Sequence, residues 1–282
     1  MEITVLGSGG CTVIPRPLCF CSVCEEARDK GVPYVRTGPA LFLNDEKLLV
    51  DTPAEISSQL NKSRIQSVSY LGFTHFDPDH VEGFRVVEQI SLDFRSWTAY
   101  PNKQIQLILP EFLKKDIKKI KSIYGPVVDF YQKAGFIKVI PFQESIRLGR
   151  THIQVIPLHQ EKHPSSVWVF MKEGKKVVYA PCDIKPFPEK REEVQGADLL
   201  VIQPGIFEEG LKHGFTYPED HISRKTLYTF PQTLALSKRI QAKQVLFVHL
   251  EEYWNRSYDD YRRLENQWDH VRFAYDGLKV TV

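Results

Sequence analysis

The segment from Thr74 to His80 constrains this chain more than any other. Its sequence, Thr-His-Phe-Asp-Pro-Asp-His, places four potential metal ligands in six positions, directly after the apolar stretch 68–73. At the end of a strand, a loop can fold such side chains back around one point, whereas a helix needs ligands at i and i+4. Imidazole and carboxylate ligands together suit zinc, manganese or iron. The alternative is an ordinary polar loop, in which Asp-Pro-Asp makes a turn.

Three further ligand types come directly after other apolar stretches. Their repeated position at predicted strand ends favours a metal centre over an incidental polar loop. The three are His163 after the stretch 152–158, Asp183 after 176–180, and His249 after 245–248. His159 is a rival to His163 as the ligand of the first of these loops.

The cysteines form a second cluster. Four of the five lie between Cys11 and Cys24, and Cys182 stands alone. The pattern Cys19-x-Cys21-x-x-Cys24 supplies three soft ligands on a tight loop, which suits structural zinc; reduced, unliganded thiols are the alternative. An odd count in a reducing compartment favours metal binding over disulfides. Cys182 is interpreted as a small buried packing residue.

Composition narrows the class of protein. Hydrophobic residues make up 42% of the 282 residues, enough for a sizeable core, and 37 Lys+Arg against 35 Asp+Glu leave a net charge of +2. This balance gives no general attraction to nucleic acid or membrane. No apolar run approaches the roughly 20 residues of a transmembrane helix, and the first residues lack the features of a signal peptide. We therefore expect a soluble, cytoplasmic protein without a membrane partner.

The order of elements predicts two sheets with helices on their outer faces, because strands occur in runs with hairpins and single helices interrupt them. No repeat or linker marks a boundary, so we expect one domain over residues 1–282. The glycine-rich stretch 7–10 predicts a tight turn near the site. Helices are expected at 55–62, 81–95, in two stretches within 111–134, and at 221–240.

These motifs resemble the metallo-β-lactamase superfamily, whose signature is Thr-His-x-His-x-Asp-His after a strand. Within it, the chain is most similar to PhnP-type cyclic-phosphate phosphodiesterases. The resemblance implies a four-layer αββα sandwich with two metal ions at one edge. Besides the segment 74–80, the resemblance rests on the cysteine loop 19–24, which we call the knuckle, and on Ala27-Arg28 after it. It also rests on Leu6-Gly7-Ser8-Gly9-Gly10, Leu49-Val50-Asp51, the region of His221, and Val248-His249.

The resemblance also implies a ligand set. One ion would be held by His75, Asp77 and His163, the other by Asp79, His80 and His249, with Asp183 bridging both. Asp77 departs from the family pattern, which has histidine there. A carboxylate still ligates, but it shifts the first site towards manganese or iron.

Two divalent ions would lower the pKa of a bridging water, supply hydroxide and clamp a phosphoryl oxygen. Asp79 is placed to orient the attacking water. His221 matches a family histidine that protonates the leaving group, and its near-neutral pKa suits that role. The alternative is that Asp220 or His221 only caps the following helix.

The knuckle also departs from the family, in which a histidine three residues after the last metal histidine is the fourth zinc ligand. Glu252 stands at that position, and Cys11 is the nearest spare thiol. Three thiolates with Glu252, another fourth ligand, or an empty knuckle therefore remain open. Asp51 is expected to support the metal loop rather than to ligate.

The sequence thus predicts a metal-dependent hydrolase that acts on a small-molecule phosphodiester, either a small cyclic phosphate or a nucleotide. RNA is not favoured as a partner, since no long insertion resembles the arm of transfer-RNA-processing nucleases. The oligomeric state is left open, with a homodimer as one option. The alternatives are an iron-dependent oxidoreductase, suggested by Asp77, and a non-catalytic binding protein whose metal sites are degenerate at Asp77 and Glu252.

Overall fold

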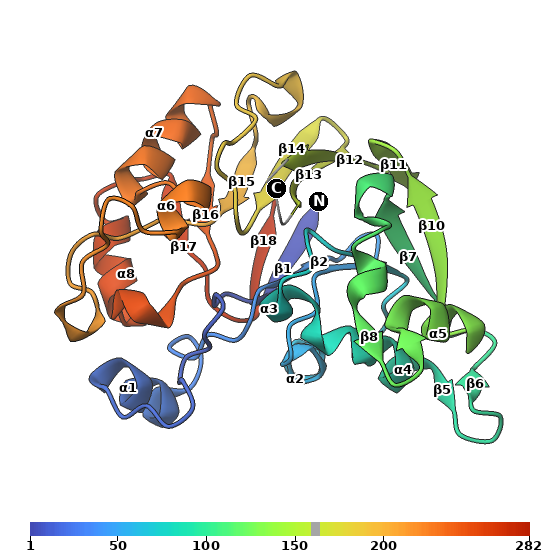
Figure 1. Cartoon of the computed structure of the whole chain (residues 1–282). Helices are drawn as coiled ribbons and strands as arrows, with labels where there is room; N and C mark the ends of the chain where they lie inside the picture. The colour runs from blue at the N-terminus through green and yellow to red at the C-terminus, as the bar shows by residue number, and fades with distance from the viewer. Residues whose placement is uncertain (159–163) are drawn as a thin grey trace.

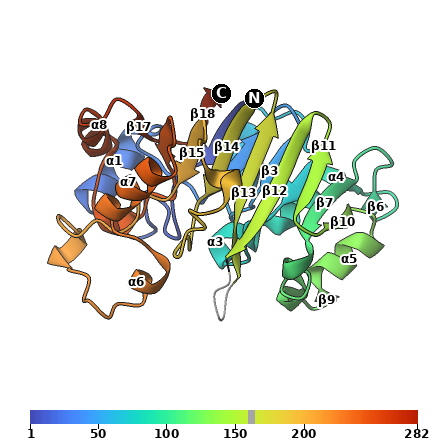
Figure 2. The ribbon, with the colours of Figure 1, turned by 90° about the horizontal axis from the view of Figure 1, so that it is seen from above.

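The computed structural model describes residues 1–158 and 164–282. Two seven-stranded sheets pack face to face, and helices cover their outer sides (Figures 1 and 2). The expected four-layer αββα sandwich is confirmed. No helix in the described part of the chain is both long and apolar enough to cross a membrane.

The first sheet has the strand order β10-β7-β4-β3-β2-β1-β18. Its strands are β1 (Glu2–Gly7), β2 (Ala40–Leu43), β3 (Leu48–Val50), β4 (Tyr70–Gly72), β7 (Ile105–Pro110), β10 (Ile137–Phe142) and β18 (Leu278–Thr281). β2 and β3 form an antiparallel hairpin in which Leu41 faces Val50. From β3 through β4 and β7 to β10 the strands are parallel, so their carboxyl ends point to the same edge.

The second sheet has the order β11-β12-β13-β14-β15-β16-β17. Its strands are β11 (Ser145–Leu148), β12 (Thr151–Leu158), β13 (Ser165–Lys172), β14 (Lys175–Ala180), β15 (Leu199–Ile202), β16 (Val245–Phe247) and β17 (Val271–Phe273). The four strands from β14 to β17 run parallel to one another. The loops after β14 and β16 therefore leave the sheet at one edge.

Side chains alternate between the two faces of each sheet, as the period of two in a strand requires. On β14, Val177 and Tyr179 pack between the sheets, whereas Val178 and Ala180 pack under the outer helices. Gly72 at the end of β4 lets the two sheets approach each other closely, because a Cβ there would lie 2.4 Å from the ring of Trp168 on the opposite sheet. Ser166 then donates a hydrogen bond from Oγ to the Thr74 carbonyl at 2.7 Å, which ties the second sheet to the loop after β4.

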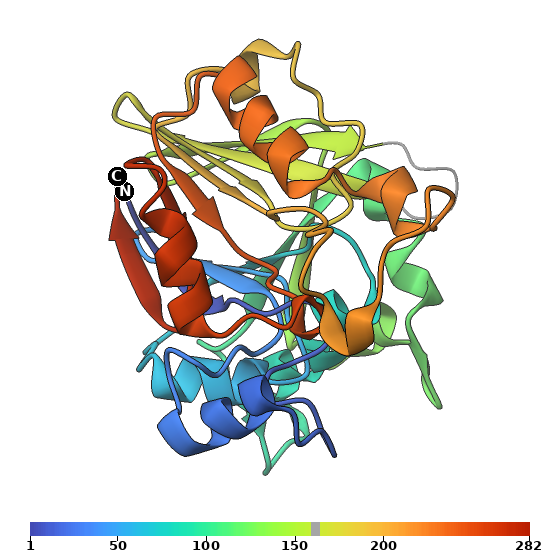
Figure 3. The ribbon, with the colours of Figure 1, turned by 90° about the vertical axis from the view of Figure 1, so that its left-hand side faces the viewer.

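The helices fall into two outer layers and one separate element. α2 (Ile56–Lys62), α4 (Val86–Ser91) and α5 (Val127–Lys133) contribute to the apolar cluster outside the first sheet. α7 (Phe230–Arg239) and α8 (Tyr258–Glu265) cover the second sheet. α1 (Ser22–Lys30) projects from the N-terminal part of the chain, as Figure 3 shows in blue. The short elements are α3 (Pro78–Val81), α6 (Ser223–Thr226), β5 (Leu92–Asp93), β6 (Thr98–Ala99), β8 (Lys121–Ser122) and β9 (Gly125–Pro126).

Three of the predicted helices are wrong in extent. The helix at 81–95 is interrupted: a 3-10 turn at Glu82–Arg85 precedes α4, and the chain then enters β5. In 111–134 only α5 is an α-helix, after two 3-10 turns and the β8–β9 hairpin. The helix at 221–240 breaks between α6 and α7. There Thr229 makes a capping box with Gln232, and a proline lies in the first turn, so a new helix begins.

The turn predicted at 7–10 is also wrong. The chain stays extended, and Gly9 forms a parallel bridge with Leu250. The expected position near the site nevertheless agrees with the structure, because Leu250 directly follows His249.

Candidate metal centre

The candidate ligands lie where parallel strands of both sheets end. His75 and Asp77 follow β4, Asp183 follows β14, and His249 follows β16. The short helix α3 then returns Asp79 and His80 towards the same point, and these six residues fall into two groups of close donor atoms.

One group has the spacing of ligands that share a single ion. His249 Nε2 lies 3.2 Å from Asp79 Oδ2 and 3.3 Å from His80 Nε2, and His80 Nε2 lies 3.5 Å from Asp79 Oδ2. A tetrahedral ion with bonds of about 2.0–2.1 Å sets its ligand atoms about 3.3 Å apart. The two imidazole nitrogens and the carboxylate oxygen are donors of the kind that bind a divalent ion, so the set fits such an ion in both spacing and chemistry.

The other group joins His75, Asp77 and Asp183, whose ligand atoms lie within 4.8 Å of one another. His75 Nε2 is 3.7 Å from Asp77 Oδ2 and is buried without a hydrogen-bond partner among the described residues. An orphaned buried nitrogen between two carboxylates fits a cation. His163, the predicted third ligand, and its rival His159 lie outside the described residues.

Cys182, interpreted from the sequence as a packing residue, lies beside this centre as a further candidate ligand. Its Sγ lies within 4.8 Å of ligand nitrogens of His75 and His80. Burial raises the pKa of Cys182 to about 12, so a thiolate there requires a cation beside it. The signal that was available is its place next to Asp183, after an apolar strand.

Asp51 stabilises the loop 74–80, which carries four of the candidate ligands. It accepts hydrogen bonds from the Thr74 backbone N–H and from Thr74 Oγ1, both at 2.8 Å, and it lies 2.9 Å from His80 Nδ1. A proton on Nδ1 leaves Nε2 of His80 free for a metal. Burial lowers the pKa of His75 and of His80 to about 3, which keeps both rings in the neutral form that binds metal.

Glu251 supports His249 in a similar way. Its Oε1 lies 3.2 Å from His249 Nδ1 and accepts the Cys11 backbone N–H at 3.1 Å. A Cβ at position 10 would lie 2.1 Å from Glu251 Oε1, so only glycine leaves room for this carboxylate. This contact accounts for Gly10 in the glycine-rich stretch.

Backbone strain is present at the centre. Asp51, Asp183 and His249 have φ values of 67°, 50° and 58°, in the left-handed region that non-glycine residues seldom adopt. Such strain costs of order 1–3 kcal/mol per residue and is typical of functional sites.

His221, the candidate proton donor, lies just before α6 within an aromatic cluster. Its ring packs edge-to-face on Tyr217 at 4.9 Å and on Phe215 at 5.9 Å between centroids. The Ser223 backbone N–H donates to His221 Nδ1 at 3.2 Å, so the neutral ring carries its proton on Nε2. Phe215 also packs edge-to-face on Tyr253 at 5.5 Å between centroids, so this cluster lies beside the segment that follows Glu251. Burial raises the pKa of Tyr217.

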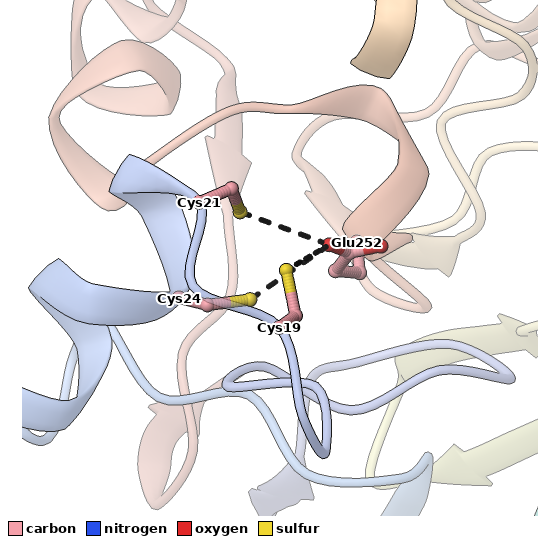
Figure 4. Close-up of side chains that lie close together, drawn as sticks. All are labelled: Cys19, Cys21, Cys24 and Glu252. Carbon is pink, nitrogen blue, oxygen red and sulfur yellow. Dashed lines mark hydrogen bonds between the residues drawn. The ribbon is translucent and has the colours of Figure 1, made fainter.

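The cysteine knuckle forms a separate group with Glu252 (Figure 4). Glu252 Oε1 lies 3.8, 3.9 and 3.7 Å from the sulfurs of Cys19, Cys21 and Cys24. Tetrahedral zinc with bonds of about 2.3 Å to sulfur and 2.0–2.2 Å to oxygen separates such ligands by roughly 3.5–3.8 Å. The near-equal distances fit an oxygen that completes a site with three sulfurs. Cys11, the spare thiol, is exposed and does not belong to this group; its Sγ lies 3.5 Å from Glu251 Oε2.

Comparison with known proteins agrees with this fold. The family described as the beta-lactamase superfamily domain matches residues 46–250. A search of curated proteins finds no match.

Solved structures of the same fold cover the whole chain. A diphosphatase from the PhnP family is 21% identical, with a TM-score of 0.74 over 100% of this chain and 97% of that one. Zinc-bound PqqB from Methylobacterium extorquens is 16% identical, with a TM-score of 0.74 over 100% of both chains. The short form of human tRNase Z is 17% identical, with a TM-score of 0.62 over 100% of this chain and 99% of that one.

Proposed function

Because this chain belongs to the metallo-β-lactamase superfamily, we propose that it is a metal-dependent hydrolase with a dinuclear centre that cleaves a small phosphodiester. The observation that carries the proposal is the spacing of Asp79, His80 and His249 beside the group of His75, Asp77 and Asp183. One of the structures with the same fold is named a diphosphatase, which supports a phosphate-containing substrate.

The residues of the site have separate roles in the proposed reaction. When bound, two divalent ions lower the pKa of a water and clamp a phosphoryl oxygen. Asp51 and Glu251 orient His80 and His249 through the ring nitrogens that face away from the donor group. Asp79 orients the attacking water. His221 donates the proton on Nε2 to the leaving oxygen, since its Nδ1 is occupied by the Ser223 N–H.

The test combines a metal count with a substrate screen. Protein purified without added metal or chelator should carry more than one equivalent of zinc, manganese or iron. It should also hydrolyse bis(p-nitrophenyl) phosphate or a 2′,3′-cyclic nucleotide. Replacing His249 with alanine should lower kcat/KM by about 10²–10³-fold, comparable to removing one electrostatic stabiliser of the transition state.

His152→Ala is the matched control, because His152 is half-buried at the start of β12, outside the donor groups. If the protein hydrolyses neither substrate with any of the three metals, or if His249→Ala keeps full activity, the proposal is wrong.

A second candidate function is an iron-dependent oxidoreductase. The observation in its favour is the pair of carboxylates, Asp77 and Asp183, beside His75, a donor set rich in hard oxygen. Iron in the purified protein together with oxygen-dependent turnover would select this function over hydrolysis.

A further inference from the structure

A buried lysine enters the cysteine knuckle. Lys212 Nζ donates to Cys19 Sγ at 2.9 Å and forms an ion pair with Glu252 Oε1. The Lys212 side chain is 7% exposed and that of Glu252 is fully buried. Arg16 adds a second positive charge, with its guanidinium nitrogen 3.6 Å from the other Glu252 oxygen, Oε2.

The charges of the possible ligand sets explain why cations are needed. A zinc ion with three thiolates and a neutral histidine has a net charge of −1. With glutamate as the fourth ligand the net charge is −2, and burying uncompensated charge is costly. Lys212 and Arg16 together supply +2, which brings the group of ligands, metal and cations to neutrality.

We propose that Lys212 is the counter-ion that allows Glu252 to replace histidine as the fourth ligand of the knuckle metal. An ammonium group has three donors and no lone pair, so it can donate to the Glu252 oxygen that faces the sulfurs and to the Cys19 thiolate together, and it cannot itself ligate the metal. Arg16 is the weaker partner, since its side chain is 47% exposed and solvent screens its charge.

Lys212 also connects the knuckle to the aromatic cluster around His221. It lies in a 3-10 turn, Lys212–Gly214, which leads directly into Phe215 and Tyr217 of that cluster. The ion pair of Lys212 with Glu252 therefore joins the knuckle to the start of the segment that leads to the candidate proton donor.

The inference rests on a metal in the knuckle and not on the hydrolase proposal, so its test reads metal binding. Cobalt loading gives a sulfur-to-cobalt charge-transfer absorption, and Cys21→Ser identifies the part that comes from the knuckle. Competition with a chelator then gives the relative affinity. Lys212→Met should weaken binding by about 10–100-fold, the usual loss when a partner of a metal ligand is removed.

The decisive comparison makes the same substitution in a variant whose fourth ligand is neutral. In a Glu252→His background, Lys212→Met should change the affinity by less than about threefold, because the extra negative charge is gone. Lys212→Arg should keep most of the affinity, whereas Lys212→Gln, which keeps a donor without the charge, should lose it. Lys172→Met is the matched control, since the Lys172 side chain is 9% exposed and pairs with Asp45 far from the knuckle in sequence.

Three results would overturn the proposal. The first is a wild-type protein without the knuckle absorption. The second is an equal loss of affinity from Lys212→Met in both backgrounds, which would indicate packing rather than charge. The third is full affinity in both Lys212→Met and Lys212→Gln. Thermal melting of every variant distinguishes a lost metal from a lost fold, and the comparison of backgrounds is made with Lys212→Gln if Lys212→Met does not fold.

Discussion

The chain holds two groups of candidate metal ligands that are assembled in opposite ways. In the knuckle, three sulfurs come from the six residues 19–24, and only Glu252 is distant in sequence. In the main centre, which is the candidate site outside the knuckle, the donors come from the short helix α3 and from the ends of β4, β14 and β16, on both sheets. The first site is local and the second depends on the whole sandwich.

This difference predicts different dependence on metal. The main centre is held in place by protein contacts, such as Asp51 with Thr74 and His80, so the loops are positioned before an ion binds. The knuckle loop is held by Arg28, which donates to the Arg16 and Cys19 carbonyls, and by Lys212 at the Cys19 sulfur, but a short cysteine loop also gains much of its order from the metal itself. Loss of metal should therefore cost activity at the main centre and stability at the knuckle.

The largest expected effect is that of Asp183→Ala. Because Asp183 is the proposed bridging ligand, its loss should release ions from the main centre and lower hydrolysis by at least about 10³-fold. The knuckle metal and the melting temperature should change little. Metal counting, kinetics and thermal melting of the same preparation check all three.

Asp269→Ala, which alters an exposed carboxylate, is the control for Asp183→Ala. Full activity in Asp183→Ala would remove the residue from the centre. A simultaneous loss of the knuckle metal would show that the two sites are not independent.

Cys21→Ser should have the reverse effect. Removing one thiolate should empty the knuckle and lower the melting temperature by about 5–10 °C, which corresponds to roughly 2–3 kcal/mol in a domain of this size. Metal at the main centre should remain. Cys11→Ser is the matched control because Cys11 is an exposed thiol outside the ligand group. An unchanged melting temperature and metal content in Cys21→Ser would contradict a structural metal.

Much of the clustering at the main centre was predictable, because the candidate ligands follow strands that local hydrophobicity identifies. His75, Asp183 and His249 each end an apolar run, and a strand end fixes where the next side chain begins. The two-sheet architecture followed from the same strands. The helix predicted at 221–240 was wrong because the capping box at Thr229 outweighed a continuous apolar pattern.

Two contacts between distant segments could not be predicted, those of Lys212 and of Gly10. Lys212 lies in a stretch without periodicity, and its partner Glu252 is 40 residues away. A single lysine in a loop is normally a solvated charge, so only the folded chain shows that this one is buried against a carboxylate and a thiol. Gly10 is similar, because its need for glycine comes from Glu251, far along the chain.

The smallest predicted effect concerns Cys182, a thiol near the nitrogen and oxygen donors of the main centre. This residue places one sulfur, of the type found in the knuckle, beside the nitrogen and oxygen donors of the main centre. Soft thiolate favours zinc, whereas the carboxylates of Asp77 and Asp183 favour manganese or iron. Cys182→Ser should therefore shift the preference of the centre from zinc towards manganese by several-fold, with activity in the preferred metal changed by less than about tenfold.

Competitive loading with equal zinc and manganese, followed by element-resolved counting, measures the shift. Cys182→Ala separates ligand chemistry from hydrogen bonding. If both variants keep the wild-type metal ratio, the sulfur is only a neighbour of the centre, and the sharp division between a sulfur site and a nitrogen and oxygen site holds.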